Sequence, residues 1–386
     1  MTQNPPFHTD FEQQGQDPTE VNGAYSPGVF FKASNGFPTT QPPTTTFYAW
    51  QQHLKPAITQ EMSLTTEYQL TRASSVSVGY VGILGHHLVD PQFGNQLTSP
   101  TATAPFANVV GQTGVVKITG SDAASNYSAL QAIFRQRLTA GLELTANYTY
   151  SKSLTNDIGY YGVSGINSGQ YYQQNAYDFK PEWGPAGFDV RHALNVTGEY
   201  DLPFGRGKMV GSHWNYFEDA ALGGWKLSGS SVTYTGFPVT ISSPANYSGL
   251  VYAFTGAARP NQNQPLHITG RSVSHWFGTS SGLLDVCGPG QNDGVCDYSQ
   301  QPDNAFGNVR PGTLRDPGFQ DVSMAVHKSF PVWRENRFDF RADFFNAFNI
   351  ASYADADSGI TDSNFGQISN TRSTERHIQL SLKYAF

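Results

Sequence analysis

Three short segments of the chain carry side-chain types that often do chemistry in proteins. Residues 278–282, Gly-Thr-Ser-Ser-Gly, match the nucleophile-elbow pattern, but no strand pattern precedes them and no helix pattern follows. The aspartates of 355–362 have a spacing that could hold calcium, without the bidentate glutamate and flanking helices of an EF-hand. His86 and His87 are explained more simply as a pair at a strand end than as a metal site. We therefore expect no catalytic residue, metal or cofactor, and a protein that is not an enzyme.

The two cysteines, Cys287 and Cys296, enclose a short stretch rich in glycine, aspartate and asparagine. Such a loop brings two cysteines within disulfide distance easily, and disulfides persist in oxidising compartments. Asp285, Asp293 and Asp297 lie nearby, but two cysteines with mixed carboxylates match no recognised metal spacing. We predict a disulfide that staples a loop.

The composition is polar, weakly charged and rich in aromatic residues. Of the 386 residues 14% are charged, and there are 39 glycines, 20 tyrosines and 26 phenylalanines. This profile is unusual for a cytosolic enzyme and fits a protein whose polar surface lies in loops and a lumen. The formal net charge of −7 argues against a nucleic-acid partner, which would require a basic surface.

No stretch approaches the ~20 apolar residues of a membrane-spanning helix, so any crossing must use strands of roughly 9–11 residues. Residues 1–7 show neither the basic region nor the apolar core of a signal peptide. If the protein is exported, we expect that its beginning is missing.

Alternation of polar and apolar residues is the main structural signal. In the last ten residues, Ile378, Leu380, Leu382, Tyr384 and Phe386 share one face of a strand. The same period predicts about nine strands, at 62–70, 74–84, 127–138, 141–151, 190–202, 223–235, 317–330, 337–349 and 375–386. The predicted fold class is all-β, an antiparallel transmembrane β-barrel with long extracellular loops.

The strand at 337–349 indicates which face is wet. Arg337, Asp339, Arg341 and Asp343 alternate with apolar residues. On a lipid face each charge would cost on the order of 2–4 kcal/mol near the midplane. These four charges are therefore expected to line a lumen.

The connections between the predicted strands alternate in length. The short ones are 71–73, 139–140 and 331–336, and the long ones are 85–126, 152–189, 236–316 and 350–374. Outer-membrane barrels have short periplasmic turns and long extracellular loops. The connection 203–222, on the short side, is longer than this rule predicts and includes a possible amphipathic turn at 215–222. An odd strand count leaves the two ends on opposite faces, so we expect 1–61 to be an extracellular loop with an incomplete strand, and 62–386 to be part of a larger barrel.

Local motifs agree with this arrangement. Asp189 and Arg191 are predicted to pair at the rim of the lumen. Residues 202–208 form a predicted turn, in which proline ends the strand and two glycines take positive φ. Asn346 and Asn349 are predicted to cap a strand end.

Six motifs stand in order along the chain. They are 79–82 (Gly-Tyr-Val-Gly), 148–154 (Tyr-Thr-Tyr-Ser-Lys-Ser-Leu), 188–192 (Phe-Asp-Val-Arg-His), 202–208 (Leu-Pro-Phe-Gly-Arg-Gly-Lys), 338–349 (Phe-Asp-Phe-Arg-Ala-Asp-Phe-Phe-Asn-Ala-Phe-Asn) and 364–368 (Asn-Phe-Gly-Gln-Ile). With the terminal strand, this series resembles the C-terminal barrel half of the Oar-like TonB-dependent receptors and covers most of residues 55–386. Each motif alone is weak, and their order makes the match specific.

The resemblance implies an outer-membrane transporter of a Gram-negative bacterium, with a 22-stranded barrel, an N-terminal plug and uptake powered through TonB. We expect the chain to depart from this pattern, without the signal peptide, the TonB-contacting box, the plug and about half of the strands. We expect a barrel fragment of about nine or ten strands that reaches the TonB system only through the missing N-terminal half. The expected partners are outer-membrane lipid and the barrel-assembly machinery, for which Tyr384 and Phe386 would be the C-terminal signal.

Ligand recognition is expected in the long loops, where flat aromatic faces beside asparagine and glutamine suit sugars or peptides. Loop packing explains these aromatic residues equally well. The candidates are Tyr160, Tyr161, Tyr171, Tyr172, Trp183 and Trp276. The predicted function is uptake or binding of a large or scarce substrate such as a glycan, a peptide or a chelate.

Two alternatives stay open. The chain could close or oligomerise as a passive pore or surface adhesin, which predicts conductance or binding without an energy source. It could instead be a secreted soluble β-protein that binds glycans, which predicts that the apolar faces pack against a second sheet.

Overall fold

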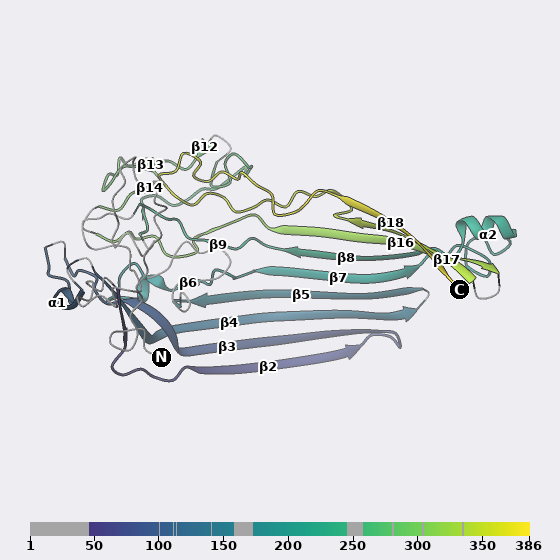
Figure 1. Ribbon diagram of the computed structural model, residues 1–386, viewed down its shortest axis with the longest axis horizontal. Helices are drawn as coiled ribbons and strands as arrows, with labels where there is room; N and C mark the ends of the chain where they lie inside the picture. Colours follow the sequence, from purple (N-terminus) through teal and green to yellow (C-terminus); the bar gives the residue numbers. More distant parts are fainter. Residues whose placement is uncertain are drawn as a thin grey trace, which may run out of the picture.

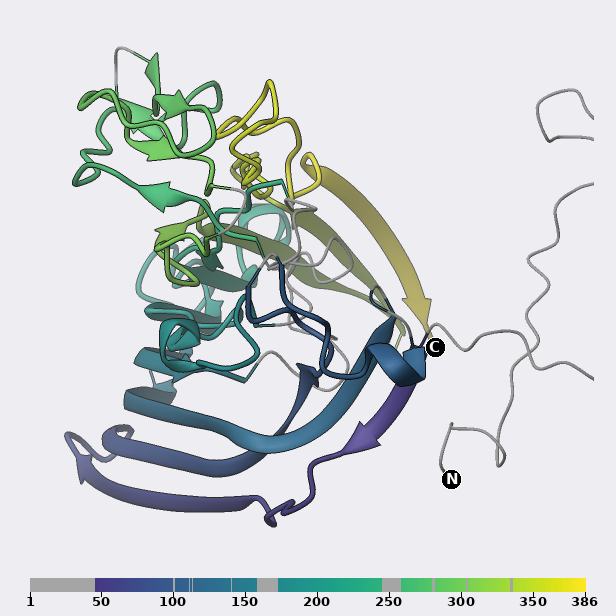
Figure 2. The same ribbon diagram turned by 90° about the vertical axis from the view of Figure 1, so that its left-hand side faces the viewer.

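The computed structural model describes residues 46–99, 101–110, 112, 114–139, 141–157, 173–244, 258–279, 282–302, 305–333 and 336–386. In this part of the chain, nine long strands form one antiparallel sheet in the order β18-β17-β16-β8-β7-β5-β4-β3-β2. They are β2 (Ile58–Gln69), β3 (Ser74–Phe93), β4 (Val115–Thr139), β5 (Leu142–Thr155), β7 (His192–Asp201), β8 (Lys226–Tyr234), β16 (Phe319–Trp333), β17 (Asn336–Phe345) and β18 (His377–Ala385). The sheet curves into an open half-barrel (Figure 2). Each predicted strand is present, and the all-β antiparallel fold is confirmed.

The register of the sheet sorts side chains by polarity. Ala342 of β17 lies opposite Leu380 of β18, and the next residue along, Arg341, lies opposite Ser381. Because successive side chains point to opposite faces, one face collects apolar residues and the other collects charges and hydroxyls. We call the face of Ala342 and Leu380 the outer face, and the face of Arg341 and Ser381 the inner wall.

No second sheet covers the outer face in the described part of the chain. Leu64 of β2 is 74% exposed and Leu380 of β18 is 67% exposed. A soluble β-sandwich would bury such residues between two sheets. The hypothesis of a secreted soluble β-protein predicts a second sheet packed on this face, and the described residues contradict that packing.

The two ends of the sheet differ as the connection lengths predict. The long loops gather at one end, which we call the loop end, whereas the short connections and the C-terminus lie at the other, the turn end (Figure 1). The connection between β7 and β8 contains α2 (Tyr216–Leu222). Asn215 caps this helix, since its side chain accepts from the backbone N–H groups of Phe217 and Glu218. In the described residues, no helix is both long and apolar enough to cross a membrane.

The predicted loop at 85–126 is partly wrong. β3 and β4 stay paired as far as Phe93 and Lys117, with register shifts between Gly85 and Asp90. A short strand, β1 (Thr46–Trp50), pairs with β4 in parallel. Beyond a membrane both faces of a strand can meet water or loops, so pairing continues there without the alternation on which the prediction relied.

The predicted strand at 337–349 is too long, because the chain turns after Phe345. Asn346 and Asn349 take left-handed backbone conformations, with φ values of 47° and 53°, which an extended strand cannot contain. The Asn346 side chain binds both the N–H and the carbonyl of Ile350 and the carbonyl of Thr374. This residue therefore caps the strand end, as the sequence predicts.

The loop end folds into a unit with its own core, which we call the cap. The core residues are Val239, Ile241, Phe277, Leu284, Tyr298, Val309, Leu314, Ala356, Ile360 and Phe365. Short elements at this end are α1 (Ala107–Val110), η3 (Lys180–Glu182), β6 (Gly184–Pro185), β9 (Pro238–Val239), β10 (Asn261–Gln262), β11 (Gly278–Thr279), β12 (Gly282–Leu283), β13 (Val286–Cys287), β14 (Tyr298–Ser299) and β15 (Leu314–Arg315). Two segments that the sequence predicts only as loops thus share one buried core.

Candidate functional site

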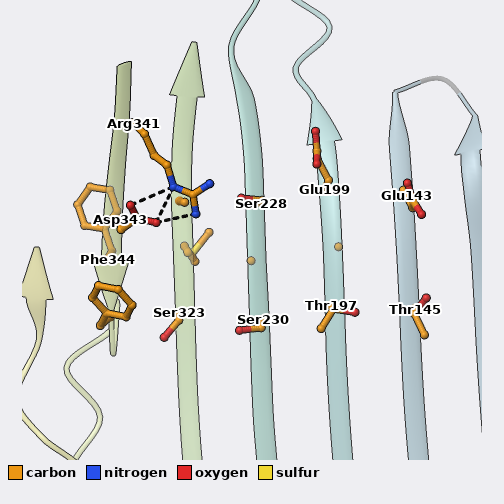
Figure 3. Close-up of a pocket in the computed structure, with 15 residues that line it drawn as sticks. Glu143, Thr145, Thr197, Glu199, Ser228, Ser230, Ser323, Arg341, Asp343 and Phe344 are labelled. Atoms are coloured by element: carbon orange, nitrogen blue, oxygen red, sulfur yellow. Dashed lines mark hydrogen bonds and ion pairs between the residues drawn. The ribbon is translucent and has the colours of Figure 1, made fainter. Parts of the chain in front are cut away.

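A hollow lined by both polar and apolar side chains lies on the inner wall near the turn end. It encloses about 540 Å³ and is lined by side chains from five neighbouring strands (Figure 3). Its polar lining residues are Glu143 and Thr145 of β5, Thr197 and Glu199 of β7, Ser228 and Ser230 of β8, Ser323 of β16, and Arg341 and Asp343 of β17. Rows of hydroxyl groups in the middle of the wall are therefore flanked by charged groups.

The four charges predicted for a lumen lie on the inner wall and pair along their own strand. The guanidinium of Arg341 contacts the carboxylate of Asp343 at 2.7 Å, and that of Arg337 contacts Asp339 at 3.2 Å. A strand places residues i and i+2 on the same face, which allows both pairs. Each cation thus neutralises its neighbour and leaves the wall polar without an unpaired strong charge at β17.

A second charged group lies on β7 and β8, and the sequence analysis did not identify it. The ammonium of Lys226 lies 3.0 Å from a carboxylate oxygen of Asp201 and 3.3 Å from one of Glu199. Glu143 of β5 lies directly opposite Glu199 in the register, so two carboxylates face each other across the strands. These ion pairs join side chains of two different strands, and the pattern within one strand does not predict such a contact. This part of the wall can hold hydrogen-bond donors or a cationic group.

A buried carboxylate links the cap to the rim of the sheet. Asp189 accepts a hydrogen bond from the N–H of Ser153 at 2.6 Å and pairs with the guanidinium groups of Arg191 and Arg315. The Asp189–Arg191 distance is 3.3 Å, which confirms the predicted rim pair. Arg315 also donates to the carbonyl of Gly236, so one side chain joins two loops to the sheet.

A fully buried ion pair lies inside the loop end. Arg259 donates to both carboxylate oxygens of Glu182, at 2.7 and 2.8 Å, and to the carbonyl of Val309. Glu182 also accepts from the N–H of Gln174. A bidentate pair of this kind tolerates burial because every charged group has a partner. The sequence holds no local signal for it, since Glu182 and Arg259 lie far apart in the chain.

The predicted ligand-binding aromatics are only partly described. Tyr160, Tyr161, Tyr171 and Tyr172 lie outside the described residues, and Trp183 follows η3, half-buried. Trp276 packs against the cap core, and its indole N–H donates to the carbonyl of Arg315 at 2.8 Å. The structure thus gives Trp276 a packing role, and a role in ligand binding stays a prediction.

The two cysteines of the candidate metal segment are bonded to each other. Cys287 and Cys296 form a disulfide with a Cα–Cα distance of 5.9 Å. A ligand atom of Asp293 lies within 4.8 Å of both sulfur atoms, but sulfurs joined in a disulfide are not the thiolates that bind metals. The Ser-Ser pair of 278–282 lies outside the described residues.

The acidic segment 355–362 is held by contacts within the cap. Asp355 pairs with Arg372, and Asp357 accepts hydrogen bonds from the side chain of Asn364 and from the N–H of Gly359. His87 has a φ of 55° where β3 changes register, so the histidine pair marks a bend in the strand.

One carboxyl group of the cap has a shifted pKa. Burial raises the pKa of Asp316 to about 7, and the nearby carboxylate of Asp355 acts in the same direction. The N–H of Ala356 donates to Asp316 at 2.9 Å, and this bond and the charge of Arg372 oppose the shift.

The C-terminal aromatic pair lies at the turn end. The ring of Tyr384 lies 5.0 Å from that of Phe338 and 6.1 Å from that of Phe386, and Phe386 is almost fully exposed. Both positions share the parity of the outer face. Their role as a barrel-assembly signal stays a prediction.

The chain matches a family model described as "Outer membrane beta barrel domain" over residues 1–379. It belongs to this family and is an outer-membrane protein. No curated protein matches it.

Several solved structures resemble the chain in fold. The outer membrane transporter YddB from Escherichia coli is 10% identical with a TM-score of 0.41, and the match covers 86% of this chain and 33% of YddB. The FrpB iron transporter from Neisseria meningitidis is 9% identical with a TM-score of 0.38, covering 87% and 32%. BauA, the ferric preacinetobactin receptor from Acinetobacter baumannii, is 11% identical with a TM-score of 0.39, covering 84% and 29%. The chain therefore spans about a third of the length of these structures.

Proposed function

We propose that the chain forms part of the barrel wall of a TonB-dependent outer-membrane transporter, which takes up or binds a large or scarce substrate such as a glycan, a peptide or a chelate. The observation that carries this proposal is the combination of a polar inner wall with a folded cap at the loop end. A polar wall suits a lumen, and ordered extracellular loops suit substrate capture. The proposed role is non-enzymatic.

The outer face and the inner wall of the sheet are proposed to contact different partners. The outer face contacts outer-membrane lipid, and the terminal strand is recognised by the barrel-assembly machinery. The serine and threonine rows of the inner wall form hydrogen bonds with a polar solute or with a plug domain. Energy would enter through an N-terminal segment that contacts TonB, which the sequence resemblance places ahead of the barrel.

The DNA immediately upstream of Met1 gives the first test. An in-frame plug-like domain with a signal peptide would support the proposal. A stop codon followed by unrelated sequence would contradict it and leave a passive pore or a surface adhesin.

Uptake measurements give the second test. Cells that produce the protein from its own locus are offered labelled glycans, peptides and iron chelates. We expect uptake of one class to fall to background when the tonB gene is deleted or the proton-motive force is collapsed. Uptake that persists under both conditions would identify a passive pore instead.

A further inference from the structure

A lysine within an apolar row places α2 on the outside of the barrel. Lys328 lies between Val326 and Phe330 on the outer face of β16, opposite Phe340 of β17, yet it is only 5% exposed. Its ammonium donates to the backbone carbonyl of Ala220 in α2 at 2.5 Å. Carbonyls in the last turn of a helix carry the negative end of its dipole and stabilise a cation. The helix therefore covers the outer face and does not lie below the lumen.

Aromatic contacts join the helix to the same face. The ring of Trp225 lies 6.1 Å from Phe340 and 6.4 Å from Phe330, edge-on in both cases. Its indole N–H donates to the carbonyl of Ala221 in α2 at 3.0 Å. Aromatic residues concentrate where a barrel passes from hydrocarbon to the polar interface. Trp225 therefore marks the interface level, and α2 lies beside it.

Internal contacts hold the segment around α2 in a defined conformation. The N–H of Arg206 donates to the Asp219 carboxylate at 2.7 Å, which ties the turn after β7 to the helix. Gly205 and Gly223 pack so closely that a Cβ on Gly223 would lie 2.9 Å from the Cα of Gly205. With the capping box at Asn215, these contacts hold the segment in one shape.

This ordered segment leaves its large apolar side chains uncovered. Met209 is 83% exposed and Phe217 is 81% exposed, and Tyr216 and Leu222 are exposed beside them in the sequence. In a soluble protein such a cluster would be unusual. The segment that carries these side chains is joined to the outer face of the barrel through Lys328 and Trp225.

We propose that residues 203–225 form a membrane-interface anchor, whose apolar side chains enter the phospholipid of the periplasmic leaflet of the outer membrane beside the barrel. Helices of this kind lie in the interface plane with their apolar side chains about 5–10 Å below the headgroups. Lys208 of the same segment is exposed. The anchor rests on the membrane placement of the barrel and is independent of transport.

Site-directed spin labelling of the full chain tests the anchor. The two native cysteines are joined in a disulfide, so a cysteine in the Phe217→Cys variant is the reactive thiol for a nitroxide. The labelled chain is refolded into vesicles of phosphatidylethanolamine and phosphatidylglycerol. We expect the label to collide with oxygen more than with a water-soluble nickel chelate, at a depth of about 5–10 Å. Ser212→Cys, an exposed polar position of the same segment, is the control and should be accessible to the chelate.

Equal accessibility of the two labels to the nickel chelate would overturn the proposal. In detergent, the label at 217 could be protected in a way that disappears when the chain is diluted. That result would show that a second copy covers the exposed apolar side chains, and it would also overturn the proposal. Met209→Cys lies outside the helix and gives an independent measurement if the Phe217→Cys variant does not fold. Folding of every variant is checked by heat-dependent gel mobility and circular dichroism.

Discussion

At the scale of single residues, Asp189 shows how one carboxylate couples the cap to the barrel. It is buried, and its carboxylate accepts a hydrogen bond from a backbone N–H and forms ion pairs with two guanidinium groups. A buried charge is tolerated only where its partners replace the lost hydration. The sequence predicts the partner two residues away, Arg191, and contains no indication of the distant partner, Arg315.

Replacement of Asp189 by alanine is expected to lower the free energy of unfolding by about 3–5 kcal/mol, because two partly buried guanidinium groups lose their counter-charge. Thermal unfolding in detergent, followed by circular dichroism, measures the loss. Asp339→Ala removes a carboxylate from the exposed pair with Arg337 and should change the melting temperature little. A similar loss in both variants would show that burial does not set the strength of the Asp189 contacts.

Asp316 is expected to make the stability of the cap depend on pH. Burial raises its folded-state pKa to about 7 from an ordinary value of 3.8, so folding favours the protonated carboxyl. The stability that Asp316 contributes to the folded cap is fully present below pH ~4 and is lost as the pH rises through ~7. Hydrogen exchange of residues 350–374 should therefore be faster at pH 8 than at pH 5.5, after correction for intrinsic rates.

The Asp316→Asn variant is the control for this pH dependence. An asparagine oxygen can still accept the hydrogen bond from Ala356 but does not titrate. We expect the corrected exchange rates to differ less between the two pH values. An unchanged difference would assign the dependence to another group.

At the scale of elements, α2 is held on the outer face by contacts that come from three segments. Lys328 belongs to β16, Trp225 precedes β8, and Asp219 binds the turn after β7. The sequence predicts a possible amphipathic turn at 215–222, and the structure adds the cap at Asn215. It does not predict the side of the sheet on which the helix packs, because that depends on a lysine more than a hundred residues later.

The Lys328→Met variant is expected to release α2 from the barrel. The substitution removes the donor to the Ala220 carbonyl and keeps an unbranched apolar stem on the outer face. A nitroxide at position 217 should then give a narrower spectrum, which reports faster motion. Lys226→Met removes an inner-wall lysine from the neighbouring strand β8 and should leave the spectrum unchanged. Narrowing in both variants would point to a general loosening of the sheet.

At the scale of the whole molecule, the sheet separates an apolar outer face from a polar inner wall along its full width. β2 and β18 form the edges of the described sheet. Such edges present unpaired N–H and C=O groups, which neither lipid nor dry packing can satisfy. The open sheet therefore requires partners for its two edge strands in a membrane, from a longer chain or from further copies.

Two adjacent substitutions in β18 test the assignment of the two faces. Leu380→Arg places a charge on the outer face and should cost about 2–4 kcal/mol if the position lies near the bilayer midplane. Ser381→Arg places the same side chain on the inner wall and should fold almost as well as the natural chain. The folded fraction in phospholipid vesicles, measured by gel mobility without heating, distinguishes them. Equal yields would mean that the two faces do not differ in solvent.

The sequence by itself determined the nine strands, their inner and outer sides, and the end at which the loops lie. Alternation is a local property, and a wrong register would bring Arg341 and Asp343 to the lipid, so physical chemistry leaves one solution. Tertiary structure alone decided the core of the cap, the Glu182–Arg259 ion pair and the position of α2. Each of these depends on contacts between residues far apart in the chain, where no local period connects the partners. The loop aromatics show the same limit, since the spacing of Trp276 does not reveal that its indole N–H is bound to Arg315.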